Sequence, residues 1–156
     1  MDDLDVKVLD LFSTEPRIGV LEASRRLGVA RGTVQARLDR LVARGVVRDW
    51  APTLSPEAIG FPVTAFLTLQ IRPRASHESV AAHLDGIPEV IEAFTITGAG
   101  DMWVRVVARS NQDLQRVIDR VLADPGVERS TTVIALDQQV GQRVLPLVRA
   151  AGTSGD

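Results

Sequence analysis

Residues 20–48 hold a set of arginines that suits contact with nucleic acid. Their sequence is VLEASRRLGVARGTVQARLDRLVARGVVR. Between Arg17 and Arg48 there are eight arginines and two acidic residues, a local charge of +6, whereas the whole chain carries −2. A positive field confined to one part of a mildly acidic protein indicates a nucleic-acid site rather than a generally basic chain.

The same stretch has the pattern of two helices joined by a short turn. The first helix, 20–27, is followed by Gly28, a residue type suited to the positive φ of a helix C-terminus. The second helix, 31–43, has one apolar stripe with spacings of four and three. Its members are Val34, Leu38 and Leu41. In a helix-turn-helix the second helix enters the major groove and the first crosses the DNA backbone.

We assign base contacts to polar side chains around the exposed face of the second helix, because their donors suit base edges and phosphates. They are Arg31, Thr33, Gln35 and Arg40. Arg25 and Arg26 on the first helix are expected to contact phosphates. Arg37 lies nearer the apolar stripe and contacts either DNA or an acidic residue of the domain. The alternative is a helical hairpin whose arginines form only a solvated face.

Three further elements complete the N-terminal part. A first helix, capped by Asp3 or Asp5, makes the DNA-binding unit three-helical. Residues 46–50, VVRDW, are expected to form a strand, the wing of a winged helix-turn-helix domain over residues 1–50. Residues 51–62 contain three prolines and one glycine and are assigned as a hinge. Within this hinge, Ser55 and Pro56 are expected to start a short helix.

The second half, 63–140, has the element order βαββαβ of a ferredoxin-like domain, so the fold class is α+β. The expected strands are 63–71, 90–97, 102–108 and 127–136, and the expected helices are 77–84 and 112–122, the latter capped by Asn111. Both helices should cover one sheet face and leave the other bare. The apolar residues available for the two faces include Phe66, Ile71, Phe94, Ile96 and Trp103. A bare apolar face predicts dimerisation. Residues 141–156 are assigned as a C-terminal tail.

The bulk composition limits the class of protein. A chain of 156 residues with 45% apolar residues can form one ordinary domain or two small ones. The absence of cysteine excludes disulfides and thiolate metal sites. The acidic start MDDLDVK lacks the features of a signal peptide, and no run is long enough to span a bilayer. We therefore expect a cytoplasmic protein without a membrane partner, with disorder only in residues 150–156.

Four sequence strings, taken in order, resemble the Lrp/AsnC ("feast/famine") family of prokaryotic transcription regulators over residues 3–140. The N-terminal run from LDVKVLDLF to LVARGVV is similar to the family's opening helix and helix-turn-helix pattern. LSPEAIGFPVTAF is similar to its hinge and first sheet strand, TGAGDMW to its turn before the third strand, and RSTTVIAL to its last strand. Each string alone is weak, but four in the right order and spacing identify the chain as a member.

The resemblance implies an amino-acid-sensing C-terminal domain with an effector pocket between subunits. The residues that correspond to this pocket are Gly98, Ala99, Gly100, Asp101, Thr131 and Thr132. Turn N–H groups can receive an α-carboxylate, and Asp101 can pair with an α-ammonium group. The family's turn often reads T-G-D-Y-D, so Ala99 and Gly100 replace an acid and an aromatic residue and favour a bulky effector. The other interpretation is that 98–101 is only a tight β-turn.

No residue pattern indicates an enzyme, a cofactor or a metal site. His77 and His83 are six residues apart on a short helix, a spacing that does not align them for a metal. We predict a sequence-specific transcription regulator that responds to a small molecule such as an amino acid. The alternatives are an effector-independent nucleoid-organising protein and a small-molecule enzyme on a ferredoxin-like domain. The expected partners are double-stranded DNA, further copies of the chain in a homodimer or octamer, and the effector.

Overall fold

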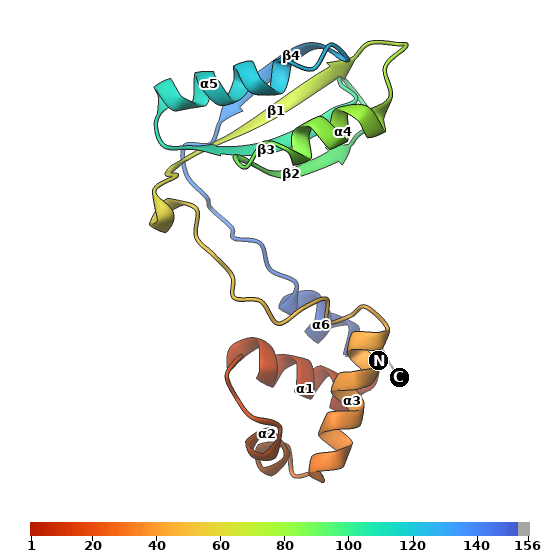
Figure 1. Cartoon of the computed structure of the whole chain (residues 1–156). Coiled ribbons are helices and arrows are strands. Elements are labelled where there is room, and N and C mark those ends of the chain that lie inside the picture. The colour runs from red at the N-terminus through yellow and green to blue at the C-terminus, as the bar shows by residue number, and fades with distance from the viewer. Residues whose placement is uncertain (153–156) are drawn as a thin grey trace. The chain divides into compact units, whose positions relative to one another are not determined.

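The computed structural model describes residues 1–152 and divides the chain into two units. The helical unit contains Met1–Thr53 together with the segment from Val140 onward, and the sheet unit contains Leu54–Gln139. Figure 1 shows the helices and strands of both units. No helix among the described residues is long and apolar enough to cross a membrane.

The helical unit begins with α1 (Asp3–Thr14), α2 (Val20–Leu27) and α3 (Arg31–Ala43). Its core consists of apolar side chains from all three helices, and the predicted stripe of α3 is part of it. The buried members are Val8, Leu9, Phe12, Ala23, Val34, Leu38 and Leu41. Gly28 ends α2 at φ 66°, as predicted.

The N-terminal cap of α1 differs from our expectation of Asp3 or Asp5. Asp2 is the cap, and its side chain accepts a hydrogen bond from the Asp5 backbone N–H at 3.0 Å. The Asp5 carboxylate accepts a hydrogen bond from the Asp2 backbone N–H at 3.2 Å in return. This reciprocal arrangement is a capping box, in which two otherwise unpaired N–H groups find acceptors. Asp5 thus takes part in the capping box, but as the residue three positions after the cap.

The expected strand at 46–50 is absent, because all four strands among the described residues belong to the sheet of the other unit. A strand needs a neighbour for its ladder of hydrogen bonds, and this segment has none within the helical unit. After α3, the Val46 and Val47 amides instead bond to the Leu41 carbonyl at 2.9 and 3.2 Å. The Trp50 ring then packs edge-on against Phe12, with centroids 5.8 Å apart.

A fourth helix of this unit, α6 (Leu145–Gly152), lies in the segment that we assigned as a tail. It packs on α1, with Val148 against the core of the helical unit. An Arg149 Nε–H donates a hydrogen bond to the Asp10 carboxylate at 2.6 Å. Ala150, which we expected to be disordered, is helical, whereas residues 153–156 lie outside the described part of the chain.

The sheet unit contains the six elements that were predicted for it. They are β1 (Val63–Ile71), α4 (His77–Asp85), β2 (Val90–Thr95), β3 (Met102–Ala108), α5 (Asn111–Leu122) and β4 (Val127–Ile134). The antiparallel sheet has the strand order β2-β3-β1-β4, and α4 and α5 cover the same face (Figure 1). Ser110, not Asn111, caps α5, because its hydroxyl accepts the Asp113 backbone N–H at 3.0 Å. In the hinge, Ser55 precedes a single 3-10 turn, Glu57–Ile59.

Alternation along β1 separates the two faces of the sheet. Ala65, Leu67, Leu69 and Ile71 are buried, while the residues between them are only partly buried. Because directly paired residues share a face, the register places Trp103 and Phe94 on the face opposite the helices. Ile71 therefore lies on the covered face, whereas Phe66, Phe94 and Trp103 belong to the bare face.

A buried carboxylate joins α5 to the segment before β2. Glu89, 9% exposed, accepts hydrogen bonds from Arg116 at 2.6 Å and Arg120 at 2.9 Å. The hydrogen bond from Arg116 lowers the pKa of Glu89 below its usual value, although burial acts in the opposite direction. The Glu89 carbonyl also accepts the Val107 backbone N–H at 2.9 Å. This charge cluster therefore fixes a loop and a helix to β3.

Candidate nucleic-acid interface

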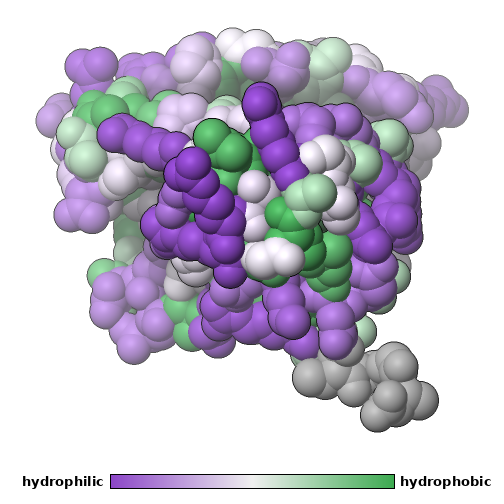
Figure 2. Space-filling view, turned by 90° about the horizontal axis from the view of Figure 1, so that it is seen from below, coloured by the Kyte–Doolittle hydropathy of each residue, from purple (hydrophilic) through white to green (hydrophobic). Residues whose placement is uncertain are grey.

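The N-terminal half of α3 presents polar side chains to solvent. Arg31, Thr33 and Gln35 are exposed, whereas Val34, between them in sequence, is fully buried. The Gln35 amide donates a hydrogen bond to Asp39 one turn later, at 2.8 Å. Figure 2 shows a face of the molecule on which hydrophilic residues surround a smaller hydrophobic area. A helix can approach base edges closely when it carries hydrogen-bond donor side chains with no bulky residues beside them.

The C-terminal half of α3 uses its arginines inside the unit. Arg40 Nη2 lies 2.7 and 2.8 Å from the two carboxylate oxygens of Asp5, and Arg37 Nη1 lies 3.0 Å from one of them. Arg37 also bonds to Asp2. Asp5 is only 1% exposed, whereas the Arg40 side chain is 47% exposed. We left open whether Arg37 contacts DNA or an acidic residue of the domain. In the structure it pairs with two acidic residues of the domain, one in α1 and one at the cap of α1.

The two carboxylates that receive these arginines have lowered pKa values. Burial alone raises the pKa of Asp5, but hydrogen bonds from Arg37, the Asp2 amide and Arg40 outweigh burial, so its pKa is lowered. The pKa of Asp2 falls from 3.8 to about 2, chiefly through its hydrogen bond with Arg37. Both groups are thus charged at neutral pH and hold α3 against the start of α1.

The arginines of α2 are exposed but form ion pairs. Arg26 bonds to Glu15 and, at 3.4 Å, to Glu22, and Arg25 lies 3.6 Å from Glu22. The side chains of Arg25 and Arg26 are 70% and 46% exposed. Exposed pairs of this kind contribute little to stability, so both guanidinium groups can exchange a carboxylate for a phosphate.

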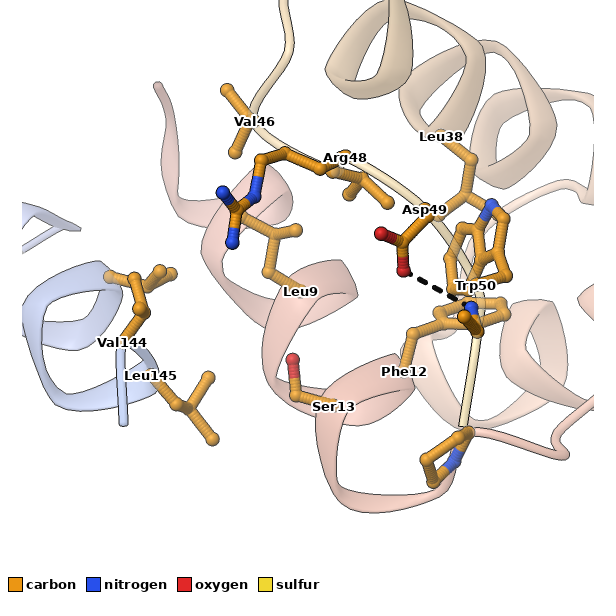
Figure 3. Close-up of a pocket in the computed structure, with 14 residues that line it drawn as sticks. Leu9, Phe12, Ser13, Leu38, Val46, Arg48, Asp49, Trp50, Val144 and Leu145 are labelled. Atoms are coloured by element: carbon orange, nitrogen blue, oxygen red, sulfur yellow. Dashed lines mark hydrogen bonds between the residues drawn. The ribbon is translucent and has the colours of Figure 1, made fainter. Parts of the chain in front are cut away.

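A cavity of about 380 Å³ lies within the helical unit, between α1, the segment after α3 and the start of α6. The close-up in Figure 3 shows Leu9, Phe12 and Leu38 along it, with Arg48 and Trp50 from the segment after α3. Asp49 accepts a hydrogen bond from the Ala51 backbone N–H at 3.1 Å, the dashed line in Figure 3. The cavity thus marks where the chain leaves α3, and Arg31, Thr33 and Gln35 do not line it.

The turn at 98–101 is held tightly against β1. The Asp101 carboxylate accepts the Ile71 backbone N–H at 2.7 Å, and the Asp101 N–H donates to the Leu69 carbonyl at 2.8 Å. A Cβ atom on Gly100 would lie 2.4 Å from Thr68 Cγ2 and 3.0 Å from the Leu69 carbonyl oxygen. Glycine at position 100 is therefore required by packing. The missing side chain opens no space beside Thr68, which removes the reason for which we expected a bulky effector.

The two threonines predicted for the effector pocket face opposite sides of the sheet. Thr131 pairs with Thr68 on the bare face, whereas Thr132 pairs with the buried Leu67. The turn and β4 are nevertheless connected through Gln70, which donates to the Ala99 carbonyl at 3.0 Å and accepts from Arg129 Nε at 2.8 Å. Sequence reasoning missed Gln70 and Arg129, although their direct pairing follows once the β1–β4 register is known.

Comparison with known proteins decides the family. Residues 1–48 match the family model described as a winged helix-turn-helix DNA-binding domain, and residues 64–145, more than half of the chain, match the Lrp/AsnC ligand binding domain. The chain belongs to the Lrp/AsnC family. It is 32% identical over 135 residues to an uncharacterized HTH-type transcriptional regulator of Pyrococcus abyssi, a match that covers 86% of this chain and 85% of that protein.

Other transcriptional regulators align over nearly the whole chain. The transcriptional regulator FL11 of Pyrococcus furiosus is 29% identical over 94% of this chain and 97% of its own length. Among solved structures, a transcriptional regulator of Neisseria meningitidis in complex with L-methionine has a TM-score of 0.85 and 28% identity, covering 96% of this chain and 99% of that one. The structure of Escherichia coli AsnC shares the fold, with a TM-score of 0.87 and 24% identity over 94% and 99% of the two chains.

These matches confirm the predicted family, the α+β class and the predicted kind of function, a DNA-binding transcription regulator rather than an enzyme. They do not test which side chains contact DNA or effector. In this Lrp/AsnC protein, Arg31, Thr33 and Gln35 are all exposed in the N-terminal half of α3, and Arg31 and Gln35 lie one turn apart on the same side of the helix. Arg37 and Arg40, in the C-terminal half of α3, instead bind Asp5 of α1.

Proposed function

We propose that this regulator reads its operator with the N-terminal half of α3, through Arg31, Thr33 and Gln35. The observation that carries the proposal is the contrast along this helix: Arg31 has no ion-pair partner among the described residues, whereas Arg37 and Arg40 share Asp5. Arg25 and Arg26 on α2 contact phosphates. We place this activity in the cytoplasm, where prokaryotic DNA is found.

The proposed DNA-bound form is a homodimer, or an octamer built from dimers, joined through the bare face of the sheet. Phe66 stacks on Trp103 there, with ring centroids 4.9 Å apart, and Phe94 lies 5.8 Å from the same ring. Phe94 and Val133 remain 51% and 58% exposed. An exposed aromatic group of this size supports association with a second copy, and a two-fold dimer predicts a pseudo-palindromic operator.

We propose further that an amino acid modulates the regulator at residues 98–101 and Thr131, close to the dimer interface, whereas Thr132, on the opposite face of the sheet, does not contact it. Support comes from the ligand-binding family model and from the relative solved with L-methionine. In this chain the Asp101 carboxylate already accepts a hydrogen bond from the Ile71 amide. Asp101 therefore stabilises the turn and does not bind the α-ammonium group of the effector. The turn N–H groups and the nearby Gln70 then offer the contacts to the effector.

Selection of binding sites from a random DNA pool tests the function. The full chain should enrich one pseudo-palindromic sequence, and Arg31→Ala with Gln35→Ala should relax the preference at distinct base positions, each at a cost of about 1–3 kcal/mol. Asp119→Ala, an exposed change on α5, is the control and should leave the selected sequence unchanged. If the double variant selects the same sequence with the same affinity, α3 does not read the bases as proposed.

Titration of the selected DNA in the presence of each amino acid tests the effector. One amino acid should change the affinity, and Gln70→Ala should weaken this response while leaving effector-free DNA binding intact. Binding that is insensitive to every amino acid, together with protection of long DNA without sequence preference, would instead support an effector-independent nucleoid-organising protein.

A further inference from the structure

Two opposite charges lie near the centre of the bare face, beside its aromatic residues. Arg105 is the middle residue of β3, an interior strand of the order β2-β3-β1-β4. Its cross-strand partners are Glu92 on β2 and Phe66 on β1. The Arg105 and Glu92 side chains lie 3.4 Å apart and are 24% and 32% exposed. Such a pair is unusual beside a stacked aromatic group, since apolar contacts alone would serve association.

The guanidinium group of Arg105 is incompletely satisfied within one chain. Its Nη1 atom reaches Glu92, but Nε is buried and has no hydrogen-bond partner within the described part of the chain. Because Nε is already covered within the chain, only the exposed part of this side chain, which is 24% exposed, is open to a second copy. The neighbours of Arg105 across the strands, Phe66 and Glu92, leave only the carboxylate as an acceptor on that row of the face.

A two-fold dimer creates a second problem for the same residue. In an isologous interface each residue meets the same patch of its partner, and an axis near the sheet centre brings two copies of Arg105 close together. Two guanidinium groups in a low-dielectric interface repel each other unless carboxylates lie between them. The carboxylate on this row is that of Glu92, and the second copy brings another.

We propose that Arg105 and Glu92 form a reciprocal charge network across the dimer interface, in which the exposed part of the Arg105 guanidinium group of each copy donates to Glu92 of the other. The proposal rests on the proposed dimer through the bare face. The aromatic residues supply the buried apolar area, while the four alternating charges fix the register of the two sheets. They also select the partner, because another chain with a like charge at either position would be rejected.

Exchange of charges between two full-length variants tests this network. Arg105→Glu leaves two carboxylates per chain, and Glu92→Arg leaves two guanidinium groups. Each variant alone should dimerise at least tenfold more weakly than the wild type, by sedimentation equilibrium. An equimolar mixture, followed by native mass spectrometry, should contain mainly heterodimers. The double variant in one chain should dimerise nearly as well as the wild type.

The matched controls are two charge reversals at exposed positions, Arg74→Glu in the turn before α4 and Asp85→Arg at the end of α4. A mixture of these two variants should form homodimers and heterodimers in statistical proportion.

Salt dependence covers the case in which Arg105→Glu does not fold, which circular dichroism would reveal. The wild-type dimer should loosen as salt rises, whereas the Glu92→Arg dimer should tighten, because salt screens attraction in one and repulsion in the other. A wild-type dimer whose charge variants mix statistically and share its salt dependence would overturn the network but keep the dimer. A wild-type chain that stays monomeric at micromolar concentration would overturn the dimer itself.

Discussion

Among the described residues, each of the two units contains one buried carboxylate bound by two arginines, and the two clusters differ in where their arginines lie. In the helical unit, Asp5 on α1 is 1% exposed and binds Arg37 and Arg40. In the sheet unit, Glu89 is 9% exposed and binds Arg116 and Arg120. The arginines of Asp5 come from the helix that we propose to enter DNA, whereas those of Glu89 come from a helix that covers the sheet.

This difference separates two roles that look alike in sequence. An arginine on α3 that binds Asp5 fixes the angle between α1 and α3, whereas Arg31 on the same helix is available to DNA. On α5 no such division is needed, because both arginines serve packing alone. A positive charge on a DNA-binding helix is therefore not by itself a DNA contact. We propose that the carboxylate opposite it decides its role.

The largest effect is expected for Asp5→Ala. It leaves the two guanidinium groups of Arg37 and Arg40 without their shared partner and also removes half of the capping box. We expect the helical unit to lose about 2–4 kcal/mol of unfolding free energy, measured by urea denaturation. Asp3→Ala, an exposed aspartate in the same turn, is the control and should change stability by less than about 0.5 kcal/mol. Equal effects of the two substitutions would contradict a special role for Asp5.

Glu89→Ala should cost the sheet unit about 2–3 kcal/mol, slightly less than Asp5→Ala, because Glu89 is less buried and its arginines remain half exposed. At a temperature where the protein stays folded, its affinity for a single operator half-site should remain that of the wild type. Half-site titration alongside thermal unfolding checks both statements. Loss of half-site affinity in a folded Glu89→Ala protein would show that the two clusters do not differ in the way described.

Removal of α6 should have a smaller effect, confined to the helical unit. A chain that ends at residue 143 loses the packing of Leu145 and Val148 and the Arg149–Asp10 ion pair. We expect about 1–2 kcal/mol of destabilisation from the lost apolar burial. Arg149→Glu alone should cost less than about 1 kcal/mol, since this pair is exposed. If the shortened chain melts like the full one, α6 contributes nothing to the unit.

The smallest effect concerns acid. Folding lowers the pKa of Asp2 from 3.8 to about 2, so this group stabilises the helical unit above pH 3.8 and its contribution is lost as the pH falls toward 2. Asn is also a good cap but carries no charge. Asp2→Asn should therefore make the melting temperature of this unit depend less steeply on pH between pH 2 and pH 3.8. Glu89 follows the same sign in the sheet unit, and Asp2→Asn should leave that unit's acid response unchanged.

The sequence sufficed to predict the elements whose pattern is local. The apolar stripe of α3, the glycine that ends α2 and the alternation of β1 each follow from periodicity or backbone preference, and all were found. The cap of α5 was assigned one residue too late and that of α1 one or three residues too late, since several nearby polar residues can fill such a position.

What could not be predicted depends on partners far apart in the chain. Nothing near Arg40 in sequence points to Asp5, 35 residues earlier. The strand at 46–50 was wrong because strand-forming residues need a neighbouring strand, and α6 was missed because it is a short helix that packs on the opposite end of the chain. The constraint on Gly100 likewise comes from Thr68 and Leu69 on another strand.

The most direct test of the central claim compares how salt affects operator binding by Arg31→Ala and by Arg40→Ala, with stability measured in parallel. If Arg31 is the arginine left for DNA, Arg31→Ala should weaken binding and, if it also neutralises a phosphate, lower the slope of log affinity against log salt by about one, with unchanged unfolding free energy. Arg40→Ala should keep the wild-type slope and lose about 1 kcal/mol of stability. The opposite pattern, in which Arg40→Ala weakens DNA binding at full stability and Arg31→Ala leaves binding intact, would contradict the claim that Asp5 divides the arginines of α3.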